Sequence, residues 1–525
     1  MLCSRITNAT ILTMDPARPT ARELGIWRGR VVGLDSDIAG LPARRVLDLD
    51  GATVLPGFID SHVHLIWAGL KARAPSVAPS KRVDAILRAV ADAVTAAPDG
   101  GWVSLGGYDQ RTLDRPLTAA DLDAVSAGRK VYLGHISGHA CLVNSAVLGE
   151  LPPHVASPDG FLAEDAMGAA LALRPPHTLA ELADAVAESG RVCRSQGVTA
   201  CAEAGIGSEL FAHSPLEGAA FQLAHETGRL PLRVQLMVAA DALRPVEAAP
   251  EDTTTRSFGL GLRTGFGDGR LSLGALKVFT DGGMMARTAA LTEPYAGSTS
   301  RGQLQADPEL LTETIVEGHR AGWQLAVHAI GDRAVDLALD ALAAARRAKP
   351  RADARHRVEH AGLVRPDQLA RFAELGAIAV VQPSFLRYFG DDYATIMGPE
   401  RAPWMYRGQG FLDHGVRLAG SSDRPVADGS PLRAVQFMVE RASASGRLIG
   451  PKEAMSVDEA LRAYTADAAY ACRWEGDAGS ISPGKRADLV VLGDDPRKVD
   501  PGRIGDIEVV RTFVEGEESL DGVAA

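Results

Sequence analysis

The chain has 525 residues, of which 46% are hydrophobic and 23% charged, which is ordinary for a globular protein and excludes a disordered chain. Acidic residues (66) outnumber Lys and Arg (55), so the net charge is -11 and no basic surplus favours a nucleic-acid partner. No run approaches the roughly 18 apolar residues that span a bilayer, and the first residues lack a signal-peptide pattern. Five scattered cysteines without a CxxC motif predict neither disulfides nor a thiolate zinc site, so we expect a cytoplasmic protein without a membrane partner.

Both ends of the chain are typical of short β-strands. Turn signals from Pro, Gly and Asp separate strand-like runs in the first 55 residues, at 6–13, 23–27, 30–34 and 46–49. Two more such runs, 487–492 and 509–514, lie near the other end. We therefore predict one small composite β domain formed by residues 1–55 and 478–525.

The middle of the chain alternates predicted strands with helical patterns. One helix is predicted over 179–195, where Thr178 and Glu181 form a capping box. Because alternating β and α segments favour parallel strands, and eight strands close a barrel, we predict an α/β protein with a (β/α)₈ barrel over 56–477. The eight predicted strands are 58–64, 198–203, 233–238, 273–280, 325–328, 357–360, 378–382 and 417–420.

One connection breaks this rhythm. About 130 residues separate the first two barrel strands, far more than a βα loop needs. We expect an inserted subdomain over roughly 70–176, which contains the motif SGHACLVNSAVL (137–148).

Two histidines end the first predicted barrel strand. His62 and His64 lie in LPGFIDSHVHL (55–65), and alternation along a strand points both imidazoles to the same side. Two such imidazoles can bind one borderline-soft metal ion such as zinc. Two histidines that only pack in the core are the alternative.

Three further residues end other predicted strands. His328 ends WQLAVHAIGD, His360 ends RHRVEHAG, and Asp423 follows a strand in GSSDRPV. Barrel enzymes place their sites at the carboxyl ends of the strands. The spacing therefore favours one shared site over isolated buried histidines.

Lys277 lies late in the apolar strand of LSLGALKVFTDGG (271–283). The chain has 47 Arg but only 8 Lys, and an unpaired buried ammonium is costly, so this lysine is a functional candidate. A neutral amine reacts with carbon dioxide to give a carbamate, which is a bridging carboxylate. The alternative is an amine that reaches a nearby acid such as Asp281.

Together these motifs resemble the amidohydrolase superfamily, and within it the amidohydrolase-3 branch of YtcJ-like and N-substituted formamide deformylase-like proteins. The likeness rests on LPGFIDSHVH, LKVFTDG, VHAIGDRA, RVEHAG, GSSDRPV, SGHACLVNSAVL and the tail GSISPGKRADLVVL, and covers about residues 5 to 495. It implies a distorted (β/α)₈ barrel with a β-sandwich built from both termini.

The resemblance also implies a centre of two divalent metal ions, usually zinc. His62 and His64 would bind one ion together with Asp423, and His328 and His360 would bind the second. Lys277, carboxylated by carbon dioxide, would bridge them. Related branches use other bridges or a single ion, so the bridge and the number of ions stay open.

Three residues are candidates for substrate contact. His139 lies in the insertion motif, where it could donate a hydrogen bond to the substrate or have no role. Met284 follows the lysine strand in DGGMMARTA and could form an adaptable apolar wall or fill a gap in the core. Arg424 follows Asp423 and could meet a substrate carboxylate or pair with a surface acid.

We therefore expect a hydrolase that cleaves a non-peptide C–N bond of a small molecule, either an N-substituted formamide or an N-acyl amine. Metal ions would activate water and polarise the carbonyl, and Asp423 would move the proton to the leaving amine. The same site could instead act on an ester, lactone or carbamate, or catalyse a non-hydrolytic reaction of the superfamily. A catalytically silent barrel with a regulatory or binding role is the alternative of another class. The family resemblance is also compatible with a homodimer.

Overall fold

The computed structural model describes residues 1–97, 101–155, 157–208, 213–252 and 254–518, and its central element is an eight-stranded sheet. Every neighbouring pair in this sheet is parallel. Its strands, in chain order, are β8 (Phe58–Val63), β13 (Val198–Ile206), β14 (Arg233–Ala239), β17 (Leu271–Phe279), β18 (Leu325–Ala329), β19 (Arg357–His360), β20 (Ile378–Val381) and β21 (Leu418–Gly420).

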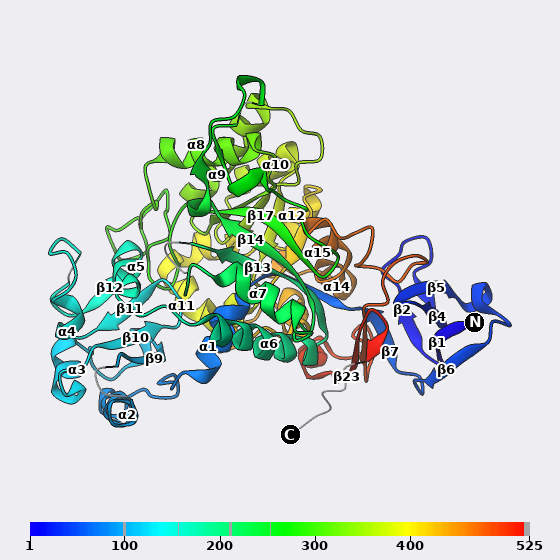
Figure 1. Ribbon diagram of the computed structural model, residues 1–525, viewed down its shortest axis with the longest axis horizontal. Coiled ribbons are helices and arrows are strands. Elements are labelled where there is room, and N and C mark those ends of the chain that lie inside the picture. The colour runs from blue at the N-terminus through cyan, green and yellow to red at the C-terminus, as the bar shows by residue number, and fades with distance from the viewer. Residues whose placement is uncertain (98–100, 156, 209–212, 253, 519–525) are drawn as a thin grey trace.

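The two edge strands of this sheet, β8 and β21, meet at their carboxyl ends. The amide of Asp423 donates to the carbonyl of His62, and the amide of His64 donates to the carbonyl of Arg424, each at 2.9 Å. The sheet is therefore curved into a nearly closed ring, and the predicted (β/α)₈ barrel is confirmed (Figure 1).

Helices surround the barrel between its strands. Helix α6 begins as predicted, because the Thr178 hydroxyl accepts a hydrogen bond from the backbone amide of Glu181 while the Glu181 carboxylate accepts one from the amide of Thr178.

No helix in the described ranges is long and apolar enough to cross a bilayer. The helices around and beneath the barrel are α1 (Leu65–Arg73), α6 (Leu179–Ser195), α7 (Glu217–Glu226), α8 (Pro308–Arg320), α9 (Asp332–Ala348), α10 (Pro366–Leu375), α11 (Ser384–Arg401), α12 (Gln409–Asp413), α13 (Pro431–Glu440), α14 (Val457–Ala463) and α15 (Ala466–Ala471). A short hairpin of β15 (Arg244–Pro245) and β16 (Arg256–Ser257) interrupts the connection from β14 to β17.

Small side chains fill part of the barrel core. Ala200, Ala202 and Ala204 share one face of β13 and belong to a buried cluster with Ala275 and Ala326. Alanines of α15 complete this cluster, so that helix covers one end of the barrel.

The long first connection has a sheet of its own, on the opposite side of the barrel from the amino-terminal strands (Figure 1). Its strands are β9 (Val103–Tyr108), β10 (Val131–His135), β11 (Ala140–Val143) and β12 (Phe161–Ala163). Its helices are α2 (Val83–Ala96), α3 (Ala119–Ser126), α4 (Ser145–Leu148) and α5 (Asp165–Ala172). We keep 70–176 as the proposed extent of this insertion; residues 98–100 and 156 lie outside the described residues.

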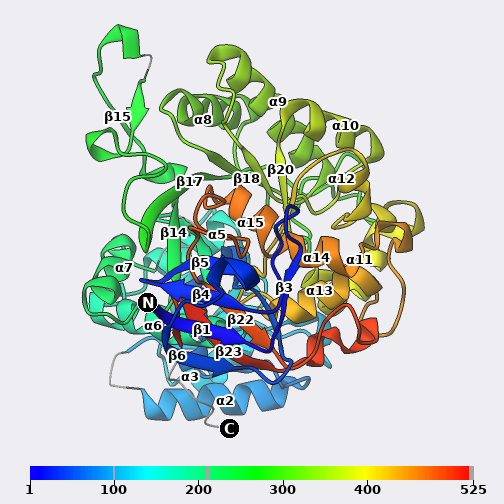
Figure 2. The same ribbon diagram turned by 90° about the vertical axis from the view of Figure 1, so that its right-hand side faces the viewer.

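Both ends of the chain contribute to two further sheets that share a buried apolar cluster. Figure 2 shows the carboxyl-terminal strands β22 and β23 beside the amino-terminal strands. One sheet has the order β5-β4-β1-β6, with β1 (Leu2–Thr7), β4 (Leu24–Trp27), β5 (Arg30–Leu34) and β6 (Ala43–Asp48). The other has the order β24-β23-β22-β7-β2-β3, with β2 (Thr10–Leu12), β3 (Thr20–Ala21), β7 (Thr53–Pro56), β22 (Leu489–Leu492), β23 (Val509–Val514) and β24 (Glu517–Glu518). The sandwich from both termini is thus confirmed as an architecture, while the bounds 1–55 and 478–525 stay a proposal; residues 519–525 lie outside the described residues.

The prediction of one strand over 6–13 is wrong. Asn8 has a φ of 51°, which turns the chain between β1 and β2 and sends them into different sheets. Asparagine tolerates this left-handed conformation, and its side-chain amide donates to Asp48 at 2.9 Å. The apolar run continues through the turn, so hydrophobic patterning alone does not show the break.

A buried ion pair joins the barrel to the sandwich. Arg233 on β14 donates to Asp488, next to β22, at 2.9 Å, and both side chains are less than 5% exposed. We expect Asp488→Ala to lower the free energy of unfolding by about 3–5 kcal/mol, because it removes the nearest anion from a buried guanidinium and leaves only Glu515 at 3.7 Å. Urea denaturation monitored by circular dichroism measures this change.

The exposed Asp494 provides a matched control. We expect Asp494→Ala to change stability by less than about 0.5 kcal/mol. Equal urea midpoints for the two variants would show that the Arg233–Asp488 pair does not stabilise the junction.

Candidate metal centre

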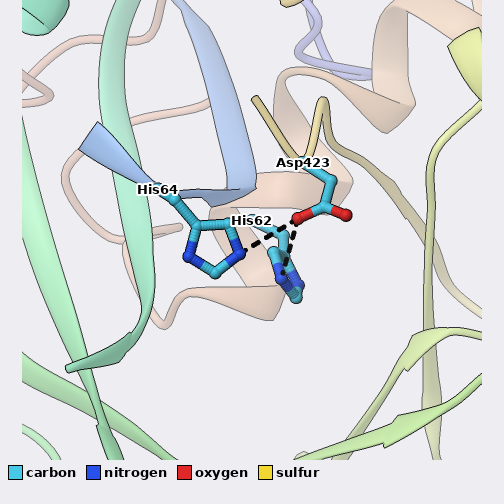
Figure 3. Close-up of side chains that lie close together, drawn as sticks. All are labelled: His62, His64 and Asp423. Atoms are coloured by element: carbon cyan, nitrogen blue, oxygen red, sulfur yellow. Dashed lines mark ion pairs between the residues drawn. The ribbon is translucent and has the colours of Figure 1, made fainter. Parts of the chain in front are cut away.

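His62 lies near the end of the first barrel strand, β8, and His64 directly follows this strand; both face the same carboxylate. The Nε2 atom of His64 lies 3.1 Å, and that of His62 3.5 Å, from Oδ1 of Asp423 (Figure 3). One potential ligand atom from each residue lies within 4.8 Å of the other two. Two imidazole nitrogens and one carboxylate oxygen in this arrangement form a suitable donor set for a zinc-like cation.

His328 and His360 extend this cluster from the ends of β18 and β19. The ring centroid of His360 lies 4.9 Å from that of His62 and 4.5 Å from that of His328. All three of these imidazoles are buried. The structure therefore brings the four predicted histidines together at the carboxyl ends of strands β8, β18 and β19.

Two residues that sequence reasoning missed orient these rings. Glu359 Oε2 lies 2.6 Å from Nδ1 of His62, and Gln382 Oε1 lies 2.9 Å from Nδ1 of His360. These contacts occupy the Nδ1 atoms of both rings and leave their Nε2 atoms to bind another ligand, as outer hydrogen bonds do for metal-binding histidines. Glu359 carries a sequence signal, because it is a charged residue inside a buried strand, whereas Gln382 carries none.

His328 is oriented through its other nitrogen. Its Nε2 lies 3.4 Å from both the carbonyl of Gly282 and Oδ1 of Asp281, so Nδ1 is the nitrogen that remains for another ligand. Burial, followed by neighbouring positive groups, lowers the pKa values of His62 and His328 well below the ordinary value. These imidazoles are therefore neutral near pH 7, which is the form that binds metal ions.

Lys277 lies inside the cluster. Its side chain is buried, its Nζ is 3.3 Å from Nε2 of His62, and the amine lies 4.7 Å from the ring centroid of Phe279. Within the described part of the chain, Nζ has no carboxylate partner at ion-pair distance. The carboxylate of Asp281 instead accepts hydrogen bonds from the backbone amides of Ala290, Ile330 and Gly331. Burial lowers the pKa of Lys277 to about 8, so a substantial fraction of this amine is neutral near physiological pH.

Asp423 follows β21, where a φ of 53° turns its side chain toward the histidines. Burial opposes its ionisation, but contact with His64 and the nearby His62 and His360 hold the pKa of this carboxyl well below its usual range. Its buried Oδ1 makes no hydrogen bond of good geometry with the described residues. A buried anionic oxygen that faces ring nitrogens is the environment that a bound cation would satisfy, so these residues fit a metal ion.

The insertion contributes His139 to the same region. The His139 ring lies 5.7 Å from the ring of His328, and its Nδ1 is 3.1 Å from Glu164. The preceding Gly138 has a φ of 76°, and a Cβ there would lie 2.4 Å from the Trp67 ring. The glycine therefore lets the insertion motif approach α1 closely and place His139 beside the cluster.

The other two candidate substrate contacts lie in different surroundings. Met284 is buried in an apolar cluster with residues such as Tyr295 and Phe385, and its role as a substrate wall stays a prediction. The Arg424 guanidinium donates to Gln196 at 2.6 Å and lies 3.9 Å from Asp428. These partners hold its guanidinium against α6, and its role as a substrate contact stays a prediction.

A family model for the amidohydrolase family, of the amidohydrolase-3 branch, matches residues 45–519. This chain belongs to the amidohydrolase family. The resemblance inferred from its motifs is thereby confirmed.

Three relatives match nearly the whole chain. The protein is 31% identical to LONG AFTER FAR-RED 3 of Arabidopsis thaliana, with 93% of this chain and 86% of that protein covered. It is 28% identical to the putative amidohydrolase YtcJ of Bacillus subtilis, with 91% of each chain covered. It is also 28% identical to the N-substituted formamide deformylase of Arthrobacter pascens, with 97% of each covered.

A solved structure shows the same architecture. An uncharacterized metal-dependent hydrolase of Pyrococcus horikoshii OT3 is 25% identical, with a TM-score of 0.77 over 95% of this chain and 99% of that one. The family and this neighbour support a metal-dependent hydrolase.

Gln382 offers a test of the inferred orientation of His360. Its Nε2 donates to Ser421 at 2.8 Å, which directs Oε1 to the ring. We expect Gln382→Leu to weaken zinc binding by about 10- to 100-fold, because His360 loses the acceptor that orients it. Competition with a fluorescent zinc chelator measures the affinity.

Gln382→Glu keeps an acceptor oxygen at the same position and is the matched variant. We expect its zinc affinity to stay closer to that of the parent protein. If the leucine variant binds zinc as tightly as the parent, His360 does not depend on this contact.

Proposed function

We propose that this protein is a metal-dependent amidohydrolase that cleaves a non-peptide C–N bond, in an N-substituted formamide or an N-acyl amine. One observation carries the proposal: four imidazoles, a carboxylate and a buried lysine gather at the carboxyl ends of the barrel strands. Catalytic groups of barrel enzymes lie at that face. The similarity to the N-substituted formamide deformylase of Arthrobacter pascens supports the choice of a formamide.

The proposed ligand sets follow the geometry. His62, His64 and Asp423 would bind one divalent ion, and His328 and His360 would bind a second. Zinc is our first candidate, because imidazole and carboxylate donors suit it.

Lys277 would supply the bridge between the two ions. Its neutral amine would attack carbon dioxide, forming a C–N bond and releasing one proton, to give a carbamate anion. Burial with no carboxylate partner among the described residues supports this role, since it keeps part of the amine unprotonated at neutral pH. The new anion would also compensate the positive charge of bound cations.

The residues of the chain provide the proton transfers. Divalent ions bound there would polarise water and the substrate carbonyl. Asp423 would accept a proton from the attacking water and return it to the amine nitrogen as the C–N bond breaks. One water is consumed, and one carboxylic acid and one amine are formed.

His139 would donate a hydrogen bond to the substrate carbonyl oxygen. Burial opposes its charged form, but the adjacent Glu164 carboxylate more than offsets this and raises the pKa of His139. A protonated or donating imidazole at this position stabilises negative charge on the oxygen.

Other reactions use the same groups. An ester, lactone or carbamate would need the same water activation and proton transfer, and a non-hydrolytic reaction of the superfamily would use the same scaffold. Parallel assays with formamides, amides, esters and lactones distinguish these reactions. A silent regulatory barrel would show no turnover in any assay and no need for metal. A small-molecule substrate, a cytoplasmic location and a homodimer stay predictions.

Asp423→Asn tests the proton-transfer role. We expect kcat to fall by about 10²- to 10⁴-fold, because an amide cannot accept the proton, while its remaining oxygen keeps metal bound. Steady-state kinetics and elemental analysis of the same sample measure both quantities. Asp428→Asn, in the same loop, is the control, and full activity of Asp423→Asn with its metal retained would reject the role.

Lys277→Ala tests the carbamate. We expect activity to be lost and partly restored by added acetate, which offers a carboxylate in place of the carbamate. Parent protein equilibrated with ¹³C-bicarbonate should show a carbamate carbon signal that is missing from the variant. The exposed Lys498→Ala is the control. Unchanged activity of Lys277→Ala would contradict the proposed bridge.

A further inference from the structure

A cavity of about 350 Å³ leads away from the proposed metal centre. His64 and Gly205 border it at one end, and Gly205 also lies against Lys277. The cavity passes α1 and strands β9 and β10 of the insertion, and it reaches Arg174 and His177 between α5 and α6. This volume is in the range of small-molecule sites, and the proposed bond cleavage uses only the end near His64.

Apolar and aromatic side chains line much of this cavity. Trp67 lies near the metal end, with its ring 5.7 Å from that of His64. Leu70, Leu105, Tyr132 and Met167 continue the wall toward the far end. The walls therefore favour an apolar or aromatic group between the reacting bond and the far end.

The acidic groups that border the cavity are already engaged by backbone amides. Glu203 accepts the amide of Leu65 at 2.5 Å, and Glu181 accepts the amide of Thr178 at 2.8 Å. Glu217 accepts two amides, those of Gly207 and His213. These carboxylates are held by the fold, so they do not favour a cationic ligand.

Arg174 is a cation on the cavity wall, and among the described residues its charge has no acidic partner. Its guanidinium lies over the Tyr132 ring, 5.1 Å from the ring centroid, and forms no ion pair with any residue in the described ranges. Arg73 also borders the cavity, but Glu188 binds it at 2.6 Å. Stacking on an aromatic face fixes the plane of a guanidinium and leaves its N–H groups available to a ligand.

On the basis of the proposed amide hydrolysis, we propose that the cavity selects substrates that carry a carboxylate at the end of an apolar or aromatic arm, and that Arg174 binds this carboxylate. The scissile amide would lie at the His64 end, the arm would pass between Trp67 and Tyr132, and the carboxylate would meet Arg174. A guanidinium can donate two parallel hydrogen bonds to a carboxylate, which gives both affinity and orientation. Arg174 is therefore a specificity-determining residue that takes no part in bond cleavage.

Two matched formamides test this selection with the full-length, metal-loaded protein. One is N-formyl-4-(aminomethyl)benzoate, and the other carries a methyl group in place of the carboxylate. We expect kcat/KM to be at least about 10-fold higher for the carboxylate, as for a hydrogen bond to a charged group. Arg174→Met should remove this preference through KM and leave kcat/KM for the methyl compound near its parent value.

Control variants separate the specific contact from general charge and folding effects. Arg174→Lys keeps a cation and should retain part of the preference. Arg73→Gln removes a cavity-bordering charge that Glu188 already neutralises, and should keep the parent ratio. A preference that is equal in the parent and in a folded Arg174→Met variant would overturn the proposal.

A binding measurement separates failure of this proposal from failure of the proposed reaction. Isothermal titration of the same proteins with 4-methylbenzoate and 4-methylbenzamide needs no turnover. Tighter binding of the benzoate by about 10-fold, lost in Arg174→Met, would support the carboxylate site even if neither formamide is hydrolysed. Benzoate binding that the variant leaves unchanged would place the carboxylate elsewhere, for example on the metal ions, and would overturn the assignment.

Discussion

The closure of the barrel between β8 and the segment after β21 is the constraint on which the site depends. The two backbone hydrogen bonds at this junction involve His62, His64 and Asp423, which are also the residues of the potential metal site. A second contact reinforces the junction, because Asp60 accepts the amide and the hydroxyl of Ser422. Backbone pairing fixes positions more tightly than side-chain contacts alone. The hydrogen bonds that close the barrel therefore also position the donor atoms of the potential metal site.

A network of ion pairs and hydrogen bonds supports the buried histidine cluster. Arg357 forms an ion pair with Glu359 at 2.8 Å and also donates to the carbonyl of Ser61 at 2.7 Å, and Glu359 in turn contacts His62. Arg357, Glu359 and His62 each have a partner in this network, so their burial is tolerated. Among the described residues Lys277 has no acidic partner at ion-pair distance, so this network does not account for its burial.

Much of the barrel could be predicted from the sequence, because its strands and helices depend on local residue patterns. All eight barrel strands lie within a few residues of their predicted bounds, and the histidines end strands as their motifs indicate. The ring partners Glu359 and Gln382 could not be assigned, since each contacts a histidine through tertiary packing. The position of Arg424 against α6 likewise depends on a helix more than 200 residues earlier in the chain. A local feature also escaped prediction: one left-handed residue, Asn8, turns the chain within an apolar run that the sequence pattern shows as continuous.

The antiparallel pairing of β7 with β22 joins two segments that are made at very different times. At ribosomal speeds of about 5–20 residues per second, β7 waits on the order of tens of seconds before β22 is synthesised. During that interval the emerging polypeptide presents an unpaired, apolar strand edge directly before the barrel sequence. Cellular chaperones that shield such edges would therefore act on this protein early in its synthesis. The pairing of β7 with β22 in the sandwich would be among the last contacts to form.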